Sequence, residues 1–198
     1  MFKIDALGKA CPLPVIETHK ALKENDVVET IVDNKIATEN LKKLAEDMGC
    51  TYTMTEESET HYTVVLAKHA GNQADEPNQI DPAAKPQDSY IVVINSPTMG
   101  TGDEAFGKQL LKTFIYTLTE QDILPQTIIF YNGGVPLVTA DSESLEDLQK
   151  MASQGVKIYA CGACLNYYGL TDKVAVGEIT NMYRIVEMMR TADRIVRP

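Results

Sequence analysis

Residues 8–14 read GKACPLP, and this stretch decides how the first part of the chain is built. Proline is favoured in the first turn of a helix, because its ring fixes φ and its missing N–H needs no partner there. We therefore expect Pro12 at the first helical position, with Pro14 close behind it. The stretch thus predicts that Cys11 caps the N-terminus of a helix.

A cysteine in this position should be reactive. A helix N-terminus carries about half a positive charge, which favours the thiolate, and the thiolate is the nucleophilic form. A free cysteine with a pKa of about 8.5 is only about 3% ionised at pH 7. Lowering that pKa by about two units would make it roughly three-quarters ionised, and Lys9 is expected to add to the effect. The alternative is that Cys11 is a small, buried and inert residue, as many free cysteines are.

The segments around this stretch alternate between strand and helix patterns. The predicted strands are residues 2–6, 27–32, 51–55 and 62–67. The predicted apolar helix faces are Val15, Ile16, His19 and Leu22, and then Leu41, Leu44, Ala45 and Met48. Thr38 is expected to cap the second helix, Gly49 to end it, and Cys50 and His19 to be packing residues. The order β-α-β-α-β-β predicts a two-layer domain over residues 1–69, with both helices on one face of a four-stranded sheet.

Residues 70–88, AGNQADEPNQIDPAAKPQD, separate this domain from a second one. The segment contains three prolines and many polar residues, so it cannot bury enough apolar surface to offset the entropy lost on ordering. We predict a linker here and a second domain over residues 89–198.

The second domain alternates short apolar runs with helical patterns, as a parallel sheet requires. The predicted strands are residues 90–95, 127–131, 156–160, 174–176 and 194–196. The predicted helices carry Phe106, Leu110, Leu111, Phe114 and Leu118, then Leu145, Leu148 and Ala152, and finally residues 181–189. This pattern predicts a three-layer α/β fold with a mostly parallel sheet, which binds ligands at the carboxyl ends of its strands.

Cys161, Gly162, Ala163 and Cys164 follow the third of these strands, so both cysteines should lie at the carboxyl edge of the sheet. At this spacing a cysteine pair can close a disulfide, bind a metal or pass sulfur between its thiols. A structural zinc site needs four ligands, and Cys50 and the three histidines lie in the other domain without matching spacing. We therefore expect no metal and no cofactor, and favour thiol chemistry over a purely structural role.

Two loops should lie near the same edge. Residues 96–104 superficially resemble a phosphate-binding turn, but Asp103 and Glu104 would repel an anion and are better explained as capping residues. Gly133 and Gly134 are either turn glycines or positions that let a sulfur-donating chain approach closely. Tyr167 and Tyr168 could line the cysteine site, but packing in the core is the default expectation.

Charge and hydropathy narrow the class of partner. The net charge of −10 argues against nucleic-acid binding, which needs a basic patch. The apolar runs are far shorter than the roughly 20 residues that cross a membrane, and residues 1–5 are too polar for a signal core. We expect a cytoplasmic protein with reduced thiols and no membrane partner.

Residues 10–14, ACPLP, resemble the Cys-Pro-x-Pro signature of the TusA/SirA sulfur carriers, whose element order residues 1–69 also match. The second domain resembles the DsrE-like sulfur-relay proteins, and the domain pairing resembles YedF-type proteins. The residues that carry this second resemblance are 98–100, 102–103, 132–135, 161–165 and 168–170. The resemblance implies that Cys11 accepts a persulfide from a cysteine desulfurase-type donor or another sulfur-relay protein. It also implies a link with selenium metabolism and a homo-oligomer formed through the second domain.

The leading hypothesis is a persulfide carrier in which Cys11 delivers sulfur to Cys161 or Cys164. The residues expected to support these thiols are Pro12, Pro14, Gly162, Gly133 and Gly134. Two alternatives remain open. The same thiols could carry selenium, or Cys161 and Cys164 could close as a disulfide in a redox-responsive binding protein that transfers nothing.

Overall fold

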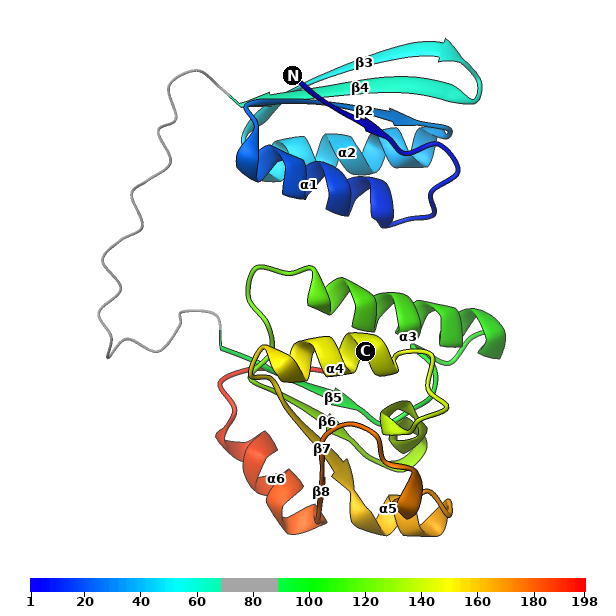
Figure 1. Ribbon diagram of the computed structural model, residues 1–198, viewed down its shortest axis with the longest axis vertical. Coiled ribbons are helices and arrows are strands. Elements are labelled where there is room, and N and C mark those ends of the chain that lie inside the picture. Colours follow the sequence, from blue (N-terminus) through cyan, green and yellow to red (C-terminus); the bar gives the residue numbers. More distant parts are fainter. Residues whose placement is uncertain (69–88) are drawn as a thin grey trace, which may run out of the picture. The chain divides into compact units, whose positions relative to one another are not determined.

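The computed structural model describes residues 1–68 and 89–198, which form two compact units (Figure 1). The predicted linker, residues 70–88, lies outside the described residues, as does position 69. Each unit has its own hydrophobic core and is described by itself.

The first unit is a four-stranded sheet with both helices on one face, as predicted (Figure 1). The strand order is β1-β2-β4-β3, in which β1 and β2 are parallel and the other neighbours antiparallel. Its elements are β1 (Phe2–Asp5), α1 (Leu13–Glu24), β2 (Val27–Val32), α2 (Lys35–Asp47), β3 (Cys50–Ser58) and β4 (His61–Lys68). Strand β3 is longer than predicted, because polar residues up to Ser58 continue the backbone pairing along an exposed edge.

Helix α1 packs on the sheet through a face that hydropathy alone does not reveal. Its buried residues are Pro14, Thr18 and Leu22, spaced four apart. The Thr18 hydroxyl lies 2.7 Å from the Pro14 carbonyl oxygen and 2.7 Å from the Thr30 hydroxyl of β2, so its burial leaves no polar group unsatisfied. The prediction that His19 is a buried core residue is wrong, because the helix turns this side chain to a half-exposed position.

Helix α2 confirms the predicted buried positions Leu41, Leu44 and Ala45. Its cap is Asn34, whose side-chain oxygen accepts the Ala37 N–H at 2.9 Å. Thr38, the predicted cap, lies on the buried face instead, where its hydroxyl donates to the Lys35 carbonyl oxygen at 2.8 Å. Thr38 was therefore predicted to start the helix although it is a buried polar residue within it.

The second unit is a five-stranded sheet of order β8-β7-β6-β5-β9, in which every neighbouring pair is parallel. Its strands are β5 (Ile91–Ile94), β6 (Thr127–Phe130), β7 (Lys157–Cys161), β8 (Glu178–Thr180) and β9 (Ile195–Val196). Its helices are α3 (Glu104–Thr119), η1 (Asn132–Val138), α4 (Leu145–Ser153), α5 (Gly162–Tyr167), η2 (Thr171–Lys173) and α6 (Met182–Thr191).

Helices α3 and α4 cover one face of this sheet and α6 covers the other, which confirms the three-layer arrangement (Figure 1). Two details differ from the prediction. Phe106 is 61% exposed, because the buried face of α3 runs through Gly107, Leu111 and Ile115. The strand predicted at residues 174–176 is a loop, and the edge strand is β8, whose three residues are too short for an alternating pattern.

Gly133 and Gly134 allow η1 to lie directly against the end of β5. A Cβ atom on Gly134 would stand 2.3 Å from the Ile94 carbonyl oxygen, and one on Gly133 would stand 2.8 Å from Pro97 Cδ. Backbone cannot yield as a flexible side chain can, so close packing accounts for the glycine at position 134.

We expect Gly134→Ala to destabilise the second unit by about 1–3 kcal/mol, because the added methyl group overlaps backbone atoms. Gly102→Ala is the matched control, since a Cβ atom there meets nothing within 4 Å. The control should stay within about 0.5 kcal/mol of the parent. Urea unfolding followed by circular dichroism measures both changes, and equal midpoints for the two variants would show that the contact is relieved without cost.

Candidate functional site

Cys11 lies in the loop between β1 and α1 with its side chain exposed. Helix α1 begins at Leu13 and Pro12 is its N-cap residue, so the helix begins one residue later than predicted and Cys11 precedes the cap. The Cys11–Pro12 peptide bond is cis. Pro14 lies at the second helical position and is buried, which anchors the helix start against the sheet.

The amides at the start of α1 do not converge on the sulfur atom. Leu13 N–H donates to the Ala10 carbonyl oxygen at 3.0 Å, and the next two N–H groups, of Val15 and Ile16, donate to the Pro12 carbonyl oxygen at 3.0 and 3.1 Å. Cys11 Sγ instead lies 3.9 Å from the side-chain amide nitrogen of Asn40 on α2. The predicted capping role of Cys11 is therefore wrong, because carbonyl oxygens already occupy these donors.

The loop that carries Cys11 is fixed by charged side chains on either side. Lys9 Nζ lies 2.7 and 2.6 Å from the two carboxylate oxygens of Glu17, so its charge is balanced by that partner. Gly8 N–H donates to Asp33 at 2.8 Å, and this bond is the main cause that lowers the pKa of the Asp33 carboxyl. A small cavity of about 30 Å³ adjoins the thiol, between this loop and the first half of α2. The loop thus holds Cys11 at the surface beside α2.

Cys161 and Cys164 lie at the carboxyl edge of the second sheet, as predicted. Cys161 is the last residue of β7 and is 1% exposed, whereas Cys164 lies in α5 and is half-buried. A Cβ atom on Gly162 would stand 3.0 Å from Ile179 Cγ2 and 3.4 Å from the Thr180 carbonyl oxygen, so glycine lets α5 start close to β8. Of these two thiols, only that of Cys164 is accessible to another molecule.

Cys164 is held by the chain that follows β6. The backbone N–H of Asn132 donates to Cys164 Sγ at 3.1 Å. Burial raises the pKa of the Cys164 thiol, the Asn132 N–H opposes that shift, and the hydrogen bond and charge of Cys161 add to it. The Cys164 thiol is therefore in contact with η1, and the neighbouring Cys161 thiol affects its pKa.

Asn132 and Tyr168 belong to this site; the sequence predicted no role for Asn132 and offered Tyr168 only as the alternative to core packing. Tyr168 O–H donates to the Asn132 side-chain oxygen at 3.0 Å. Tyr167 and Tyr168 are 82% and 44% exposed, and their ring centroids lie 5.1 Å apart in an edge-to-face arrangement. The default expectation that they pack in the core is therefore wrong, and for Tyr168 the alternative at the cysteine site agrees with the structure. The Asn-Gly pair after a strand was a usable signal, because asparagine tolerates positive φ and marks turns.

Residues 1–68 and 89–198 contain neither a metal-binding cluster nor a membrane-spanning helix. In these ranges no three side chains of His, Cys, Asp or Glu come together in a way that could hold a metal ion. The same ranges include no helix with the length and apolar character to span a bilayer.

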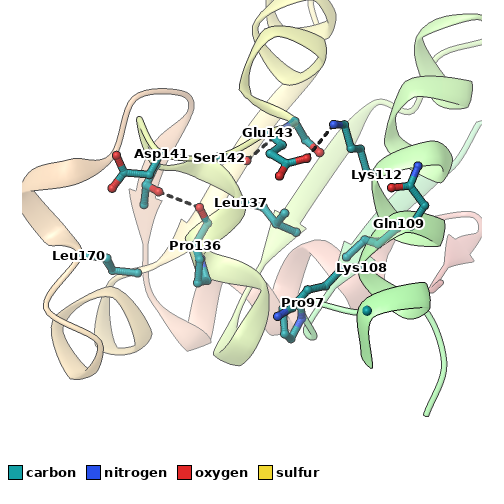
Figure 2. Close-up of a pocket in the computed structure, with 14 residues that line it drawn as sticks. Pro97, Lys108, Gln109, Lys112, Pro136, Leu137, Asp141, Ser142, Glu143 and Leu170 are labelled. Carbon is teal, nitrogen blue, oxygen red and sulfur yellow. Dashed lines mark hydrogen bonds and ion pairs between the residues drawn. The ribbon is translucent and has the colours of Figure 1, made fainter. Parts of the chain in front are cut away.

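A separate cavity of about 550 Å³ lies in the second unit between α3, η1 and the loop before α4 (Figure 2). Its charged rim residues are already paired. Lys112 contacts Glu143 at 2.7 Å, Lys108 contacts Glu104 at 2.7 Å, and Asp141 lies 3.7 Å from a lysine of η2. None of the four cysteines lines this cavity, so we place the candidate site at the thiols.

Both units match known protein families. The family described as Sulfurtransferase TusA matches residues 2–68, and the DsrE/DsrF-like family matches residues 88–198. The "Putative sulfur carrier protein" of Methanocaldococcus jannaschii is 41% identical over 71 residues, which are 34% of this chain and 95% of that protein.

Solved structures are similar to each unit in turn. A SirA-like protein from Desulfitobacterium hafniense is 42% identical and covers 34% of this chain and 96% of its own, with a TM-score of 0.33. A protein of unknown function from Methanobacterium thermoautotrophicum is 22% identical and covers 56% of this chain and all of its own, with a TM-score of 0.43. From its family matches, the chain belongs to the sulfurtransferase TusA family through its first unit and to the DsrE/DsrF-like family through its second.

Proposed function

We propose that this protein is a sulfur relay in which Cys11 carries a persulfide and Cys164 receives its outer sulfur. The observation that carries the proposal is the exposure of Cys11, the most open of the four free thiols, in the unit that matches the TusA family. The second unit supplies Cys164, which is half-buried and lies three residues after the buried Cys161.

Loading of Cys11 is a thiol–persulfide exchange. The Cys11 thiolate attacks the outer sulfur of a donor persulfide, a new sulfur–sulfur bond forms on Cys11, and the donor leaves as a thiolate. No oxidant is consumed, because one sulfur–sulfur bond replaces another. The donor is a cysteine desulfurase-type enzyme or another sulfur-relay protein.

Transfer repeats this exchange in the second unit. The Cys164 thiolate attacks the outer sulfur of the Cys11 persulfide, and Cys11 leaves as a thiolate. Cys161 can then attack the inner sulfur of the Cys164 persulfide, which forms a Cys161–Cys164 disulfide and releases hydrosulfide. The buried position of Cys161 behind Cys164 suits this second role, since it shields Cys161 from outside reagents.

Intact mass spectrometry tests the proposal. The reduced protein is incubated with a cysteine desulfurase, cysteine and pyridoxal phosphate, and its mass is then compared with that of an untreated sample. We expect a gain of one sulfur atom, together with the loss of two hydrogen atoms in molecules whose Cys161–Cys164 disulfide has formed, and dithiothreitol should reverse both changes. A protein whose mass never changes under these conditions would contradict the proposal.

The spacing of Cys161 and Cys164, two free cysteines at one edge of the sheet, favours a second candidate, a redox switch without transfer. In that case mild oxidation should remove two hydrogen atoms from the protein, while the desulfurase treatment adds nothing. Selenium on the same thiols is the third candidate, and a gain of one selenium atom after treatment with selenide and a mild oxidant would support it.

A further inference from the structure

The Asn132 backbone adopts an unusual conformation next to Cys164. Its φ is 49°, and it is the one non-glycine residue with positive φ among residues 1–68 and 89–198. Asparagine tolerates this left-handed region better than most residues, but the conformation still needs support from its surroundings. In this conformation the Asn132 N–H points at Cys164 Sγ, with a nitrogen–sulfur distance of 3.1 Å.

Three hydrogen bonds close a ring around this arrangement. The first runs from Asn132 N–H to Cys164 Sγ, and the second runs from Tyr168 O–H to the Asn132 side-chain oxygen at 3.0 Å. The third runs from Tyr168 N–H back to the Cys164 carbonyl oxygen at 3.0 Å, within the last turn of α5. Tyr168 is therefore fixed relative to Cys164 by its backbone and relative to Asn132 by its hydroxyl.

We propose that Asn132 and Tyr168 are positioning residues that aim a backbone N–H at the sulfur of Cys164 and so favour its anionic, nucleophilic form. The inference rests on the proposed role of Cys164 as acceptor. A hydrogen bond to the charged form of a thiol favours that form, whereas burial disfavours it. Besides the Asn132 amide, the group that acts on the Cys164 thiol is the neighbouring thiol of Cys161.

The consequence is that the Cys164 sulfur depends on the Tyr168 hydroxyl through Asn132. Tyr168 does not donate to Cys164 Sγ in the structure; its hydroxyl bonds the Asn132 side chain, and Asn132 bonds the sulfur through its backbone. Removing the hydroxyl should release the Asn132 side chain, allow its backbone to relax from φ 49°, and weaken the N–H···S bond.

The rate of alkylation of Cys164 by iodoacetamide as a function of pH tests this directly. The full chain is used with Cys161→Ser as background, so that one thiol titrates in the peptide of residues 158–173. We expect Tyr168→Phe to move the alkylation midpoint upward by about half a unit to one unit, which is roughly three- to tenfold slower reaction at pH 7. Tyr167→Phe makes the same chemical change on the adjacent, 82% exposed ring and should leave the profile in place.

A double-mutant cycle separates positioning from a general structural effect. Asn132→Gly keeps the N–H and accepts positive φ but lacks the side chain, so in that background Tyr168→Phe should have no further effect. A Tyr168→Phe profile that coincides with its parent would overturn the inference, as would an undiminished shift in the Asn132→Gly background. The assay contains no sulfur donor, so its result is independent of whether the protein carries sulfur.

Discussion

Cys11→Ser is expected to abolish the gain of sulfur from a persulfide donor. A serine hydroxyl cannot form a persulfide, and it has no accessible anionic form near neutral pH. The side chain is exposed, so the substitution should change the free energy of unfolding by no more than about 0.5 kcal/mol. The expected loss is therefore one of chemistry rather than of folding.

Cys50→Ser is the matched control for this experiment. Cys50 lies in the same unit, at the start of β3, and burial raises the pKa of its thiol, which disfavours the nucleophilic form. We expect this variant to load one sulfur atom as the parent does, as measured by intact mass. If Cys11→Ser loads normally and Cys50→Ser does not, the carrier residue has been misassigned.

Cys164→Ser is expected to stop the relay after loading, with the label retained on Cys11. The acceptor nucleophile is removed, whereas the first unit, its exposed thiol and its loop contacts are untouched. Peptide mass spectrometry measures this result as sulfur that stays on residues 10–20 and never appears on residues 158–173.

Cys161→Ser provides the informative contrast. Because Cys161 lies behind Cys164 and is 1% exposed, its loss should leave sulfur transfer to Cys164 intact but prevent disulfide formation and release of hydrosulfide. The buried hydroxyl is expected to cost about 1–3 kcal/mol of stability where it finds no partner, so the fold of this variant is checked by circular dichroism. Sulfur that reaches residues 158–173 equally well in Cys164→Ser would identify Cys161 as the acceptor instead.

Much of the fold follows from patterns that can be read in the sequence. Strand β2 was predicted with its observed bounds, Val27–Val32, and the predicted apolar positions Leu41, Leu44 and Ala45 of α2 are buried. Two of the differences have a common cause. Thr18 and Thr38 are buried because their hydroxyls find backbone or side-chain partners, and hydropathy does not anticipate such pairing. The prediction for Phe106 was wrong in the opposite sense. This apolar residue is exposed, because the buried face of α3 begins at the next position, Gly107.

The sequence predicted which residues of the candidate site lie at strand ends, but not which of them contact each other. The position of Cys161 at a strand end followed from the strand pattern, and so did the placement of Cys164 on the same edge. The contact of Cys164 with Asn132 joins residues 32 positions apart through the spacing of two parallel strands. At Cys11 the proline pattern predicted a helix start correctly, but carbonyl oxygens of Ala10 and Pro12 take the amides that the thiol was expected to use.

The most direct test of the relay is the order in which labelled sulfur appears on the two cysteine peptides. The wild-type protein is mixed with a desulfurase and labelled cysteine, quenched by alkylation at successive times, and digested. We expect label on residues 10–20 first and on residues 158–173 afterwards, with the second signal absent in Cys11→Ser. Label that reaches residues 158–173 at the same rate in Cys11→Ser would contradict a relay through Cys11.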